Sequence, residues 1–180
     1  MQFSFKKLDP SYLKAAVYGA NDGIITTFAV VAGVAGAQLS VSIVLILGIA
    51  NMIADGFSMG VGDFLGARSE ERLRVQQNGN HQERTALWKT GVITFSAFIL
   101  AGSLPSIPYS LELIGLISID GQQFWWSITS TLSALFIVGS LRTYFIKGRW
   151  WWNGLEMLTI GAVAASVAYV VGAWVKSLVV

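Results

Sequence analysis

Long apolar runs dominate the chain, and short polar or charged segments separate them. A membrane-spanning helix requires about 20 mostly apolar residues. Five segments meet this requirement, namely Ala15–Ala37, Val41–Leu65, Thr90–Tyr109, Phe124–Tyr144 and Leu155–Val175. Pro105 and Pro108 close the third segment, and proline suits the exit of a helix. The pattern therefore predicts an all-α integral membrane protein with five transmembrane helices.

The polar stretches between these runs are short, so we expect residues 1–180 to form a single membrane domain. The longest stretch is a charged loop over about residues 66–89, which is too short to fold on its own. The polar, basic segment up to Lys14 lacks the pattern of a cleavable signal peptide. The first apolar run is therefore expected to be a retained span.

Composition agrees with a membrane protein. Hydrophobic residues make up 54% of the chain and charged residues only 12%, whereas soluble domains carry roughly 25% charged residues. The chain has no cysteine, which excludes thiolate metal sites and disulfides, and its single histidine argues against a histidine-rich zinc site. A net charge of +2 gives no reason to expect a nucleic-acid partner, whereas membrane lipid is an expected one.

Lysine and arginine indicate the orientation, because they are enriched in cytoplasmic loops. With the N-terminus inside, the outer segments contain only Lys176. The inner segments contain all the others: Lys6, Lys7, Lys14, Arg68, Arg72, Arg74, Arg84, Lys89, Arg142, Lys147 and Arg149. We therefore expect a cytoplasmic N-terminus and a C-terminus on the opposite side.

Glycines recur four residues apart in the first two spans, at Gly19 and Gly23, at Gly56 and Gly60, and at Gly62 and Gly66. Small residues at this spacing let helix backbones approach closely. The first two spans are therefore expected to pack tightly, either against each other or against a second copy of the chain.

Acidic and amide side chains lie inside the same two spans, with no lysine or arginine there to neutralise them. Asp22 is in the first span, and Asn51, Asp55, Met59 and Asp63 follow in the second at intervals of four. A four-residue step on a helix turns about 40° and rises about 6 Å, so these four form one slanted stripe. Carboxylate and amide oxygens bind hard cations, and a thioether binds softer ones. The set predicts a site for ferrous iron or another transition metal.

The depth of each residue within its predicted span indicates which residues of the two helices lie side by side. Asp22 lies about 10 Å and Met59 about 9 Å from the inner ends of their predicted spans, at 1.5 Å per residue. A tight turn near Gln38 makes these spans antiparallel neighbours, so we expect Asp22 and Met59 at one level. Asp55 would then lie one turn above and Asp63 one turn below. Two simpler interpretations remain open: Met59 as core filler, and Asp63 as a solvated group near the membrane edge.

Three further acids are possible points of cation access: Glu70, Glu71 and Glu156. Glu70 and Glu71 lie in the charged loop, where simple solvation is the alternative. Glu156 follows Asn153 by three residues where the fifth span begins, a pattern typical of a helix N-cap. We favour capping for Glu156.

Two runs resemble the vacuolar iron transporter family. Tyr18-Gly-Ala-Asn-Asp-Gly23, followed by residues 28–33, is similar to the first span of that family, and residues 54–64 are similar to its second span. The resemblance is specific over about residues 17–71. It implies a five-helix homodimer that exchanges ferrous iron or manganese for protons. We expect no permanently bound cofactor, since the metal is cargo.

The resemblance also assigns roles. Asp22 and Met59 match the aspartate and methionine of the family's ion path. Asp63 takes the place of a glutamate, whereas Asp55 falls where many members carry a small residue. Plant and yeast members have a long, glutamate-rich cytoplasmic region between spans two and three. The chain therefore resembles a short member that lacks this metal-binding domain.

The main hypothesis is a divalent metal transporter, not an enzyme, that moves metal out of the cytoplasm by proton exchange across the plasma membrane of a prokaryote. One alternative is an intramembrane aspartyl protease, because Gly60-Val-Gly-Asp63 fits a Gly-x-Gly-Asp pattern, although the companion Tyr-Asp motif of that class is absent. Another is a non-transporting membrane scaffold, against which the cost of acids inside a span argues.

Overall fold

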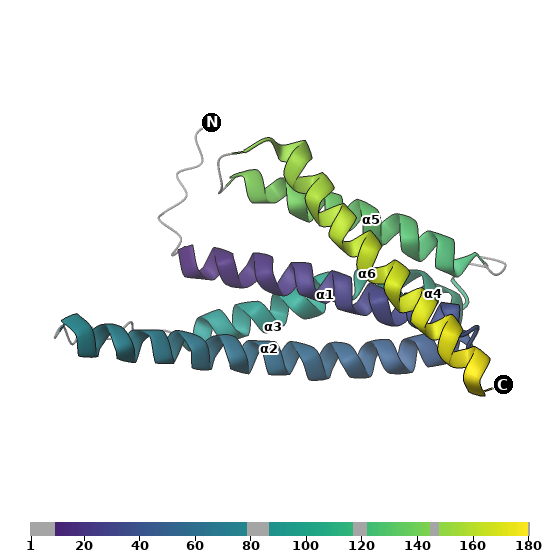
Figure 1. Ribbon diagram of the computed structural model, residues 1–180, viewed down its shortest axis with the longest axis horizontal. Coiled ribbons are helices and arrows are strands. Elements are labelled where there is room, and N and C mark those ends of the chain that lie inside the picture. The colour runs from purple at the N-terminus through teal and green to yellow at the C-terminus, as the bar shows by residue number, and fades with distance from the viewer. Residues whose placement is uncertain (1–9, 79–86, 117–121, 145–147, 180) are drawn as a thin grey trace.

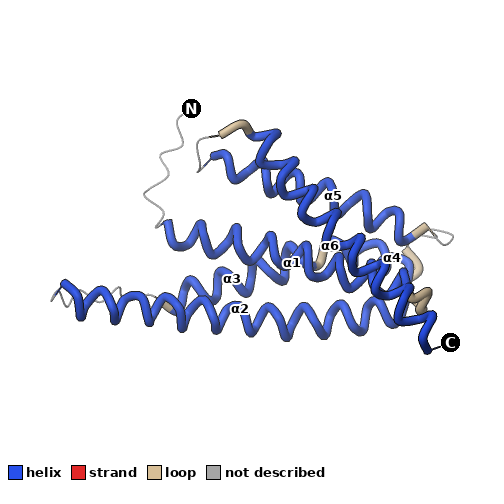
Figure 2. Tube along the Cα trace, viewed as in Figure 1, coloured by secondary structure: helices blue, strands red, loops and turns tan. Residues whose placement is uncertain are grey.

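The computed structural model describes residues 10–78, 87–116, 122–144 and 148–179, and most of these residues are helical (Figures 1 and 2). The long helices are α1 (Pro10–Gly36), α2 (Val41–Asn78), α3 (Trp88–Gly102), α5 (Gln123–Leu141) and α6 (Trp150–Val179). The short elements are η1 (Leu104–Ser106), α4 (Ile107–Leu113) and η2 (Arg142–Tyr144). Five segments of the described chain are long and apolar enough to cross a membrane, which confirms the predicted fold class.

The helices extend past the predicted spans where the chain becomes charged. α1 begins at Pro10 rather than Ala15, and α2 continues to Asn78 rather than ending near Leu65. Arginine, glutamate, leucine and glutamine in the last turns of α2 are good helix formers, so the apolar run stops before the helix does. Much of the predicted loop over residues 66–89 is therefore helical, and residues 79–86 lie outside the described residues.

The third span is interrupted near its two prolines. α3 ends at Gly102, and the prolines occupy the first turns of η1 and α4. Proline is well suited to a first turn, where its missing N–H is not needed for a helical hydrogen bond. The prolines therefore start two short elements, and the apolar segment continues to Leu113 instead of ending at Tyr109.

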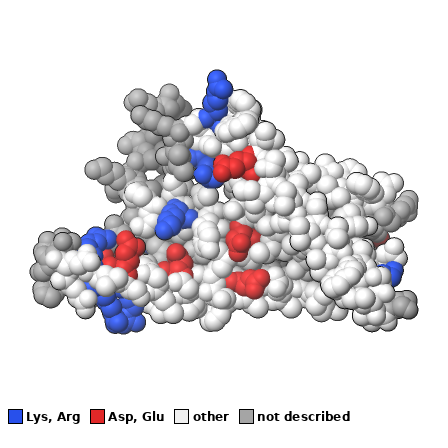
Figure 3. Space-filling model, in the orientation of Figure 1, with Lys and Arg blue, Asp and Glu red and all other residues white. Residues whose placement is uncertain are grey.

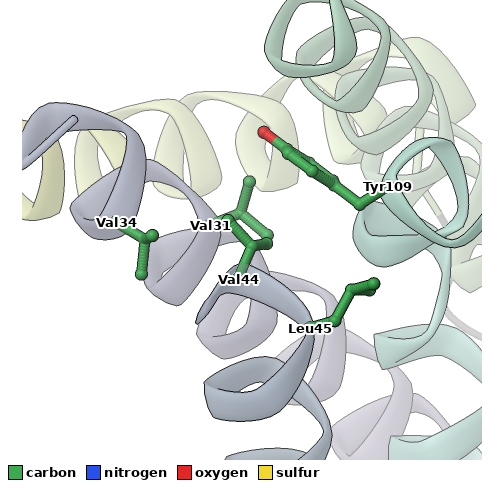
Figure 4. Close-up of a cluster of buried hydrophobic side chains, with 5 residues drawn as sticks. All are labelled: Val31, Val34, Val44, Leu45 and Tyr109. Carbon is green, nitrogen blue, oxygen red and sulfur yellow. The ribbon is translucent and has the colours of Figure 1, made fainter. Parts of the chain in front are cut away.

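α1 is the central helix and contacts α2, α3, α5 and α6. α3 lies between α1 and α2 in the half of the bundle where α1 begins, whereas α5 and α6 pair on the other side of α1 (Figure 1). Near the far end, α1, α2 and α4 share a buried cluster of Val31, Val34, Val44, Leu45 and Tyr109 (Figure 4). These contacts hold the first two spans together at the α1–α2 turn.

Gly19 and Gly23 of α1, and Gly56 and Gly60 of α2, make their close contacts with α3. A Cβ added to Gly23 would lie 2.3 Å from the carbonyl oxygen of Phe98, and one added to Gly60 would lie 2.8 Å from that of Gly91. We expected these glycines to pack against the other of the first two spans or against a second copy. For Gly19, Gly23, Gly56 and Gly60 this was wrong, because α3 makes these contacts. Gly62, by contrast, has no described atom within 4 Å of an added Cβ.

Basic side chains gather at the end of the bundle where α1 begins and α2 ends, which we call the basic end (Figure 3). Its described members are Lys14, Arg68, Arg72, Arg74, Lys89, Arg142 and Arg149. Lys176 lies at the opposite end and contacts Gln38 of the α1–α2 turn. Exposed tryptophans occupy both ends, as interfacial belts do: Trp88, Trp150, Trp151 and Trp152 at the basic end, and Trp125, Trp126 and Trp174 at the other.

Candidate metal pathway

The four-residue repeat of α2 forms one face of that helix, as predicted. Asn51, Asp55, Met59 and Asp63 are all half-buried. Asn51 Nδ2 donates a hydrogen bond of 2.7 Å to Asp55 Oδ2. This bond engages one oxygen of the carboxylate and orients the group along the helix face.

Asp22 lies at the level of Asp55. Gly23 of α1 and Gly56 of α2 both pack against Phe98 of α3, and each glycine directly follows one of the two aspartates. The two carboxylates are near enough to interact electrostatically. The expectation that Asp22 lies level with the methionine of the stripe was therefore wrong by about one helical turn. The inserted helix α3 sets the register between α1 and α2, and depths counted from predicted span ends did not include it.

A cavity of about 680 Å³ opens at the basic end beside the stripe. Met59 and Asp63 of α2 line it, together with Lys14 and Tyr18 of α1. On α2 the lining stops at Met59, about 6 Å of helix rise before Asp55. Acidic side chains continue from the basic end into the middle of this face of the molecule (Figure 3). Met59 therefore lies between the cavity and the Asp22–Asp55 pair.

Thr94 of α3 is a partner of Asp63 that the sequence reasoning missed. Its Oγ1 donates a hydrogen bond of 3.1 Å to Asp63 Oδ2, and its side chain is fully buried. A hydroxyl inside an apolar span is the signal that could have indicated it, because such groups often bond across helices. Asp63 is therefore held by a neighbouring helix and is not simply a solvated group.

Two of the three possible access acids line the cavity. Glu70 is exposed, whereas Glu71 is buried and forms an ion pair of 3.3 Å with Arg74. Glu156 lies on α6, on the far side of α1, and its carboxylate is 3.9 Å from Arg142. It is not among the described residues that line the cavity. The structure therefore brings Glu70 and Glu71 to the stripe and leaves Glu156 apart.

The predicted N-cap at Asn153 was wrong. α6 begins at Trp150, because the tryptophans before Asn153 join the helix. The Asn153 Nδ2 instead donates a hydrogen bond of 3.0 Å to Thr143 Oγ1, which ties the start of α6 to the end of α5. Glu156 consequently lies in the second turn of α6 and has the ion pair described above, not a capping role.

One chain supplies only part of a metal coordination shell. Among the described residues, no three acidic, histidine or cysteine side chains come together as a metal-binding group. The stripe and α1 offer two carboxylates at one level, an amide and, one turn away, a thioether. Hard divalent ions take about six ligands, so the remaining positions would have to be filled by water, backbone oxygens or another chain.

The geometry does not support the aspartyl protease alternative. Such an enzyme needs two aspartates that face each other across one water molecule. Asp63, in the Gly-x-Gly-Asp stretch, lies about 12 Å along α2 from the level shared by Asp22 and Asp55. Its hydrogen-bond partner is a threonine.

Comparisons with known proteins agree with this architecture. A model described as the VIT family matches residues 13–86 and 71–173. A vacuolar iron transporter of Toxoplasma gondii is 52% identical over 60 residues, which are 33% of this chain and 20% of that protein. A vacuolar iron transporter of Centaurea cyanus is 26% identical over 210 residues, covering 85% of this chain and 83% of that protein. Vacuolar iron transporter 1 of Arabidopsis thaliana is 25% identical over 209 residues, covering 85% and 82%.

The chain is short relative to these proteins. An alignment of 210 positions takes in only 85% of its 180 residues, so the Centaurea protein carries residues with no counterpart here. The two stretches matched by the family model overlap over residues 71–86, where α2 ends and the connection to α3 begins. The relatives are transporters, so the scaffold and protease alternatives are set aside. Because the family model matches most of a chain with five spanning helices, this protein belongs to the VIT family, the family of vacuolar iron transporters.

Proposed function

We propose that this chain carries a divalent metal ion, ferrous iron or manganese, out of the cytoplasm in exchange for protons. The observation that carries the proposal is the Asp22–Asp55 pair, which lies inside the spans one turn beyond the Met59 end of the cavity. Carboxylates at this depth, with no lysine or arginine beside them in α1 or α2, are expensive unless a cation or a proton neutralises them. The names of the relatives support iron as the cargo.

The basic end is the cytoplasmic side in this proposal. The positive-inside rule favours it, because the described basic residues other than Lys176 lie at that end. The cavity then opens to the cytoplasm, and Glu70, Glu71 and Asp63 attract cations into it. The N-terminus is cytoplasmic, and the fifth span leaves the C-terminus on the other side.

The ligand chemistry favours ferrous iron or manganese over calcium or magnesium. Asp22, Asp55 and the Asn51 amide provide oxygen atoms, and Met59 provides sulfur on the approach. A thioether contributes little to the binding of a hard cation but binds a softer transition metal well. A metal ion that passes Met59 exchanges water for sulfur before it reaches the carboxylates.

Exchange would follow from competition for the same carboxylates. A metal ion arriving from the cytoplasm displaces protons from Asp22 and Asp55, and protons arriving from the far side displace the metal. One divalent ion or two protons can neutralise both carboxylates, whereas a single monovalent cation leaves one of the two negative charges uncompensated.

A homodimer is part of the proposal. One face of α2 presents small, exposed residues at every fourth position, namely Ala54, Ser58, Gly62 and Gly66. No described atom lies within 4 Å of a Cβ added at Gly62 or Gly66. Small residues at this spacing suit close helix packing, and a second copy on this face would lie next to the Asp55 stripe, where ligands are still needed.

We place the protein in the plasma membrane of a prokaryote, with lipid around its exposed apolar surface. Two observations support this: the chain is short relative to its plant relatives, and only residues 79–87 separate α2 from α3. Transport would then remove excess metal from the cytoplasm without a separate domain to collect it.

The test is metal flux in proteoliposomes that carry a pH gradient, with ferrous iron and manganese measured separately. Flux that depends on the gradient, together with proton movement in the opposite direction, is the expected result. Asp22→Asn should lower this flux by roughly tenfold or more. Glu156→Gln is the matched control, because it removes an acid at the same end of the bundle but away from the cavity.

Folded, inserted protein that moves neither metal above the level of empty liposomes would overturn the transport proposal. Metal flux that is indifferent to the pH gradient and moves no protons would leave a metal transporter but overturn the antiport.

Dimerisation is tested by Ala54→Leu and Ser58→Leu, which should shift the purified protein toward a monomer, with Val163→Leu on the exposed face of α6 as the control.

A further inference from the structure

A second cavity, of about 460 Å³, lies on the side of α1 that faces α5 and α6. It shares Lys14 and Tyr18 with the metal pathway but extends away from α2. Its walls include Leu13, Val17 and Asn21 of α1, with Arg142 and Met157 opposite. None of the proposed transport steps uses this cavity.

The cavity exists because the helices diverge toward the basic end. Near the opposite end α1 and α6 are in backbone contact, where a Cβ on Gly36 would lie 2.2 Å from the carbonyl oxygen of Tyr169. Toward the basic end α5 and α6 lean away from α1 (Figure 1). The α1 residues that line the cavity extend from Pro10 to Asn21, about 16 Å of helix rise. That is about half of a hydrocarbon core of about 30 Å, or the depth of one leaflet.

Charge and apolar surface are arranged along this depth as in a phospholipid. Lys14 and Arg142 are the cationic lining residues, and Leu13, Val17 and Met157 supply apolar walls. Arg142 is only loosely engaged, because its closest contact with Glu156 is 3.9 Å, beyond hydrogen-bond distance. Basic pockets between membrane helices are well suited to acidic lipid headgroups.

We propose that this cavity binds an acidic phospholipid from the leaflet at the basic end, with its phosphate between Lys14 and Arg142 and an acyl chain along Val17 and Met157. A soluble anion would gain the two cations but would leave the apolar walls unused. A neutral phospholipid would use the walls, but its own ammonium group would oppose the cations. The combination therefore selects a lipid with net negative charge.

Native mass spectrometry of the full chain in neutral detergent tests the proposal, with dioleoyl phosphatidylglycerol and dioleoyl phosphatidylcholine supplied in equal amounts. Wild type should retain one phosphatidylglycerol with a preference of roughly tenfold or more. Arg142→Gln should lower the preference roughly fivefold, in line with one lost cation. Arg142 is the better position to vary, because Lys14 also lines the metal pathway.

Two further variants separate this site from general surface charge. Arg149→Gln is the matched control, because this arginine lies at the same end, stacks over Trp151 at 5.8 Å and is not among the described lining residues. It should leave the preference unchanged. Glu156→Gln should raise the preference, because it removes the acid that competes for Arg142. A gain of binding cannot result from misfolding.

Three outcomes would overturn the proposal. The first is equal retention of the two lipids by wild type. The second is an equal loss of preference in Arg142→Gln and Arg149→Gln, which would indicate only diffuse surface charge. The third is displacement of the lipid by glycerol 3-phosphate at equal concentration, which would indicate a site for a soluble phosphate. The measurement involves no metal, so its result is independent of the transport assay.

Discussion

Thr94 of α3 donates a hydrogen bond of 3.1 Å to Asp63 of α2. The same residue fixes the contact with α1, because a Cβ added to Gly19 would lie 2.3 Å from the Thr94 carbonyl oxygen. One buried threonine therefore orients a carboxylate of the candidate metal pathway and sets the spacing between two spans. The polar side of the cavity is thus built by three helices, although the acids themselves lie on α2.

Removing this hydroxyl should weaken both stability and metal affinity. Thr94→Val keeps the shape but leaves Asp63 without its donor, which we expect to cost about 1–3 kcal/mol of unfolding free energy. Loss of a group that orients a ligand typically costs about 10–100-fold in metal affinity, and we expect the lower end of that range. Thermal unfolding in detergent and the metal concentration at half-maximal flux measure the two effects. Thr94→Ser should restore most of both, and a serine variant as impaired as the valine variant would contradict the role given to the hydroxyl.

Asp22 and Asp55 should act as a unit. Asp22→Asn and Asp55→Asn each remove half of the charge that would hold a divalent ion, so we expect each to lower flux by roughly tenfold or more. The double variant should be little worse than the worse single one, because groups that act together give non-additive losses. Flux assays of the three variants in parallel measure this. Losses that multiply would show that the two aspartates act at separate steps.

Met59 should affect the choice of metal more than the rate of transport. Met59→Leu keeps a similar volume and removes the thioether, so flux of ferrous iron should fall relative to manganese, the harder of the two ions. The measurement is competition between the two metals in one liposome preparation. Met59→Ala serves as the comparison, because it also removes the side chain that separates the cavity from the aspartates. An unchanged metal ratio in Met59→Leu would mean that the methionine only fills space.

The positions of the spans could be predicted from sequence because hydrophobic length is a strong constraint in a membrane. The ends of α1 and α2 could not, since Lys14 and the charged residues after Leu65 lie outside the apolar runs but are good helix formers. The end of α3 at Gly102, inside the third apolar segment, could not be predicted either. Prolines mark a boundary in sequence, but they do not reveal that η1 and α4 follow it.

The residues of the stripe could be predicted from their four-residue spacing, but their partners could not. Spacing fixes which side chains share a face of one helix, whereas the level of Asp22 depends on how α3 packs between α1 and α2. That packing is decided by backbone contacts of glycine, and the spacing of the glycines predicts a close contact but not which helix makes it. The ion pair of Glu156 with Arg142 was missed for a similar reason, because it joins the end of α5 to α6 and no local pattern indicates it.

The contact between α1 and α6 offers a matched pair of substitutions. A Cβ added to Gly172 would lie 2.1 Å from the carbonyl oxygen of Gly33, whereas one added to Gly33 would meet the carbonyl oxygen of Ala168 at an ordinary 3.5 Å. Gly172→Ala should therefore push the helices apart and lower the unfolding free energy by about 1–3 kcal/mol, as overpacking does. Gly33→Ala should be neutral or gain up to about 1 kcal/mol from better helix propensity.

Thermal unfolding of the purified protein in detergent measures both variants, and the difference between them is the informative quantity. Both substitutions add one methyl group to the same helix contact, so effects of added volume or hydrophobicity cancel. Equal destabilisation would mean that α1 and α6 meet in another register. In that case the close α1–α6 contact would no longer explain why these helices diverge toward the basic end. A large difference in the expected direction would establish the contact that holds α1 to α6 and leaves the second cavity open between them.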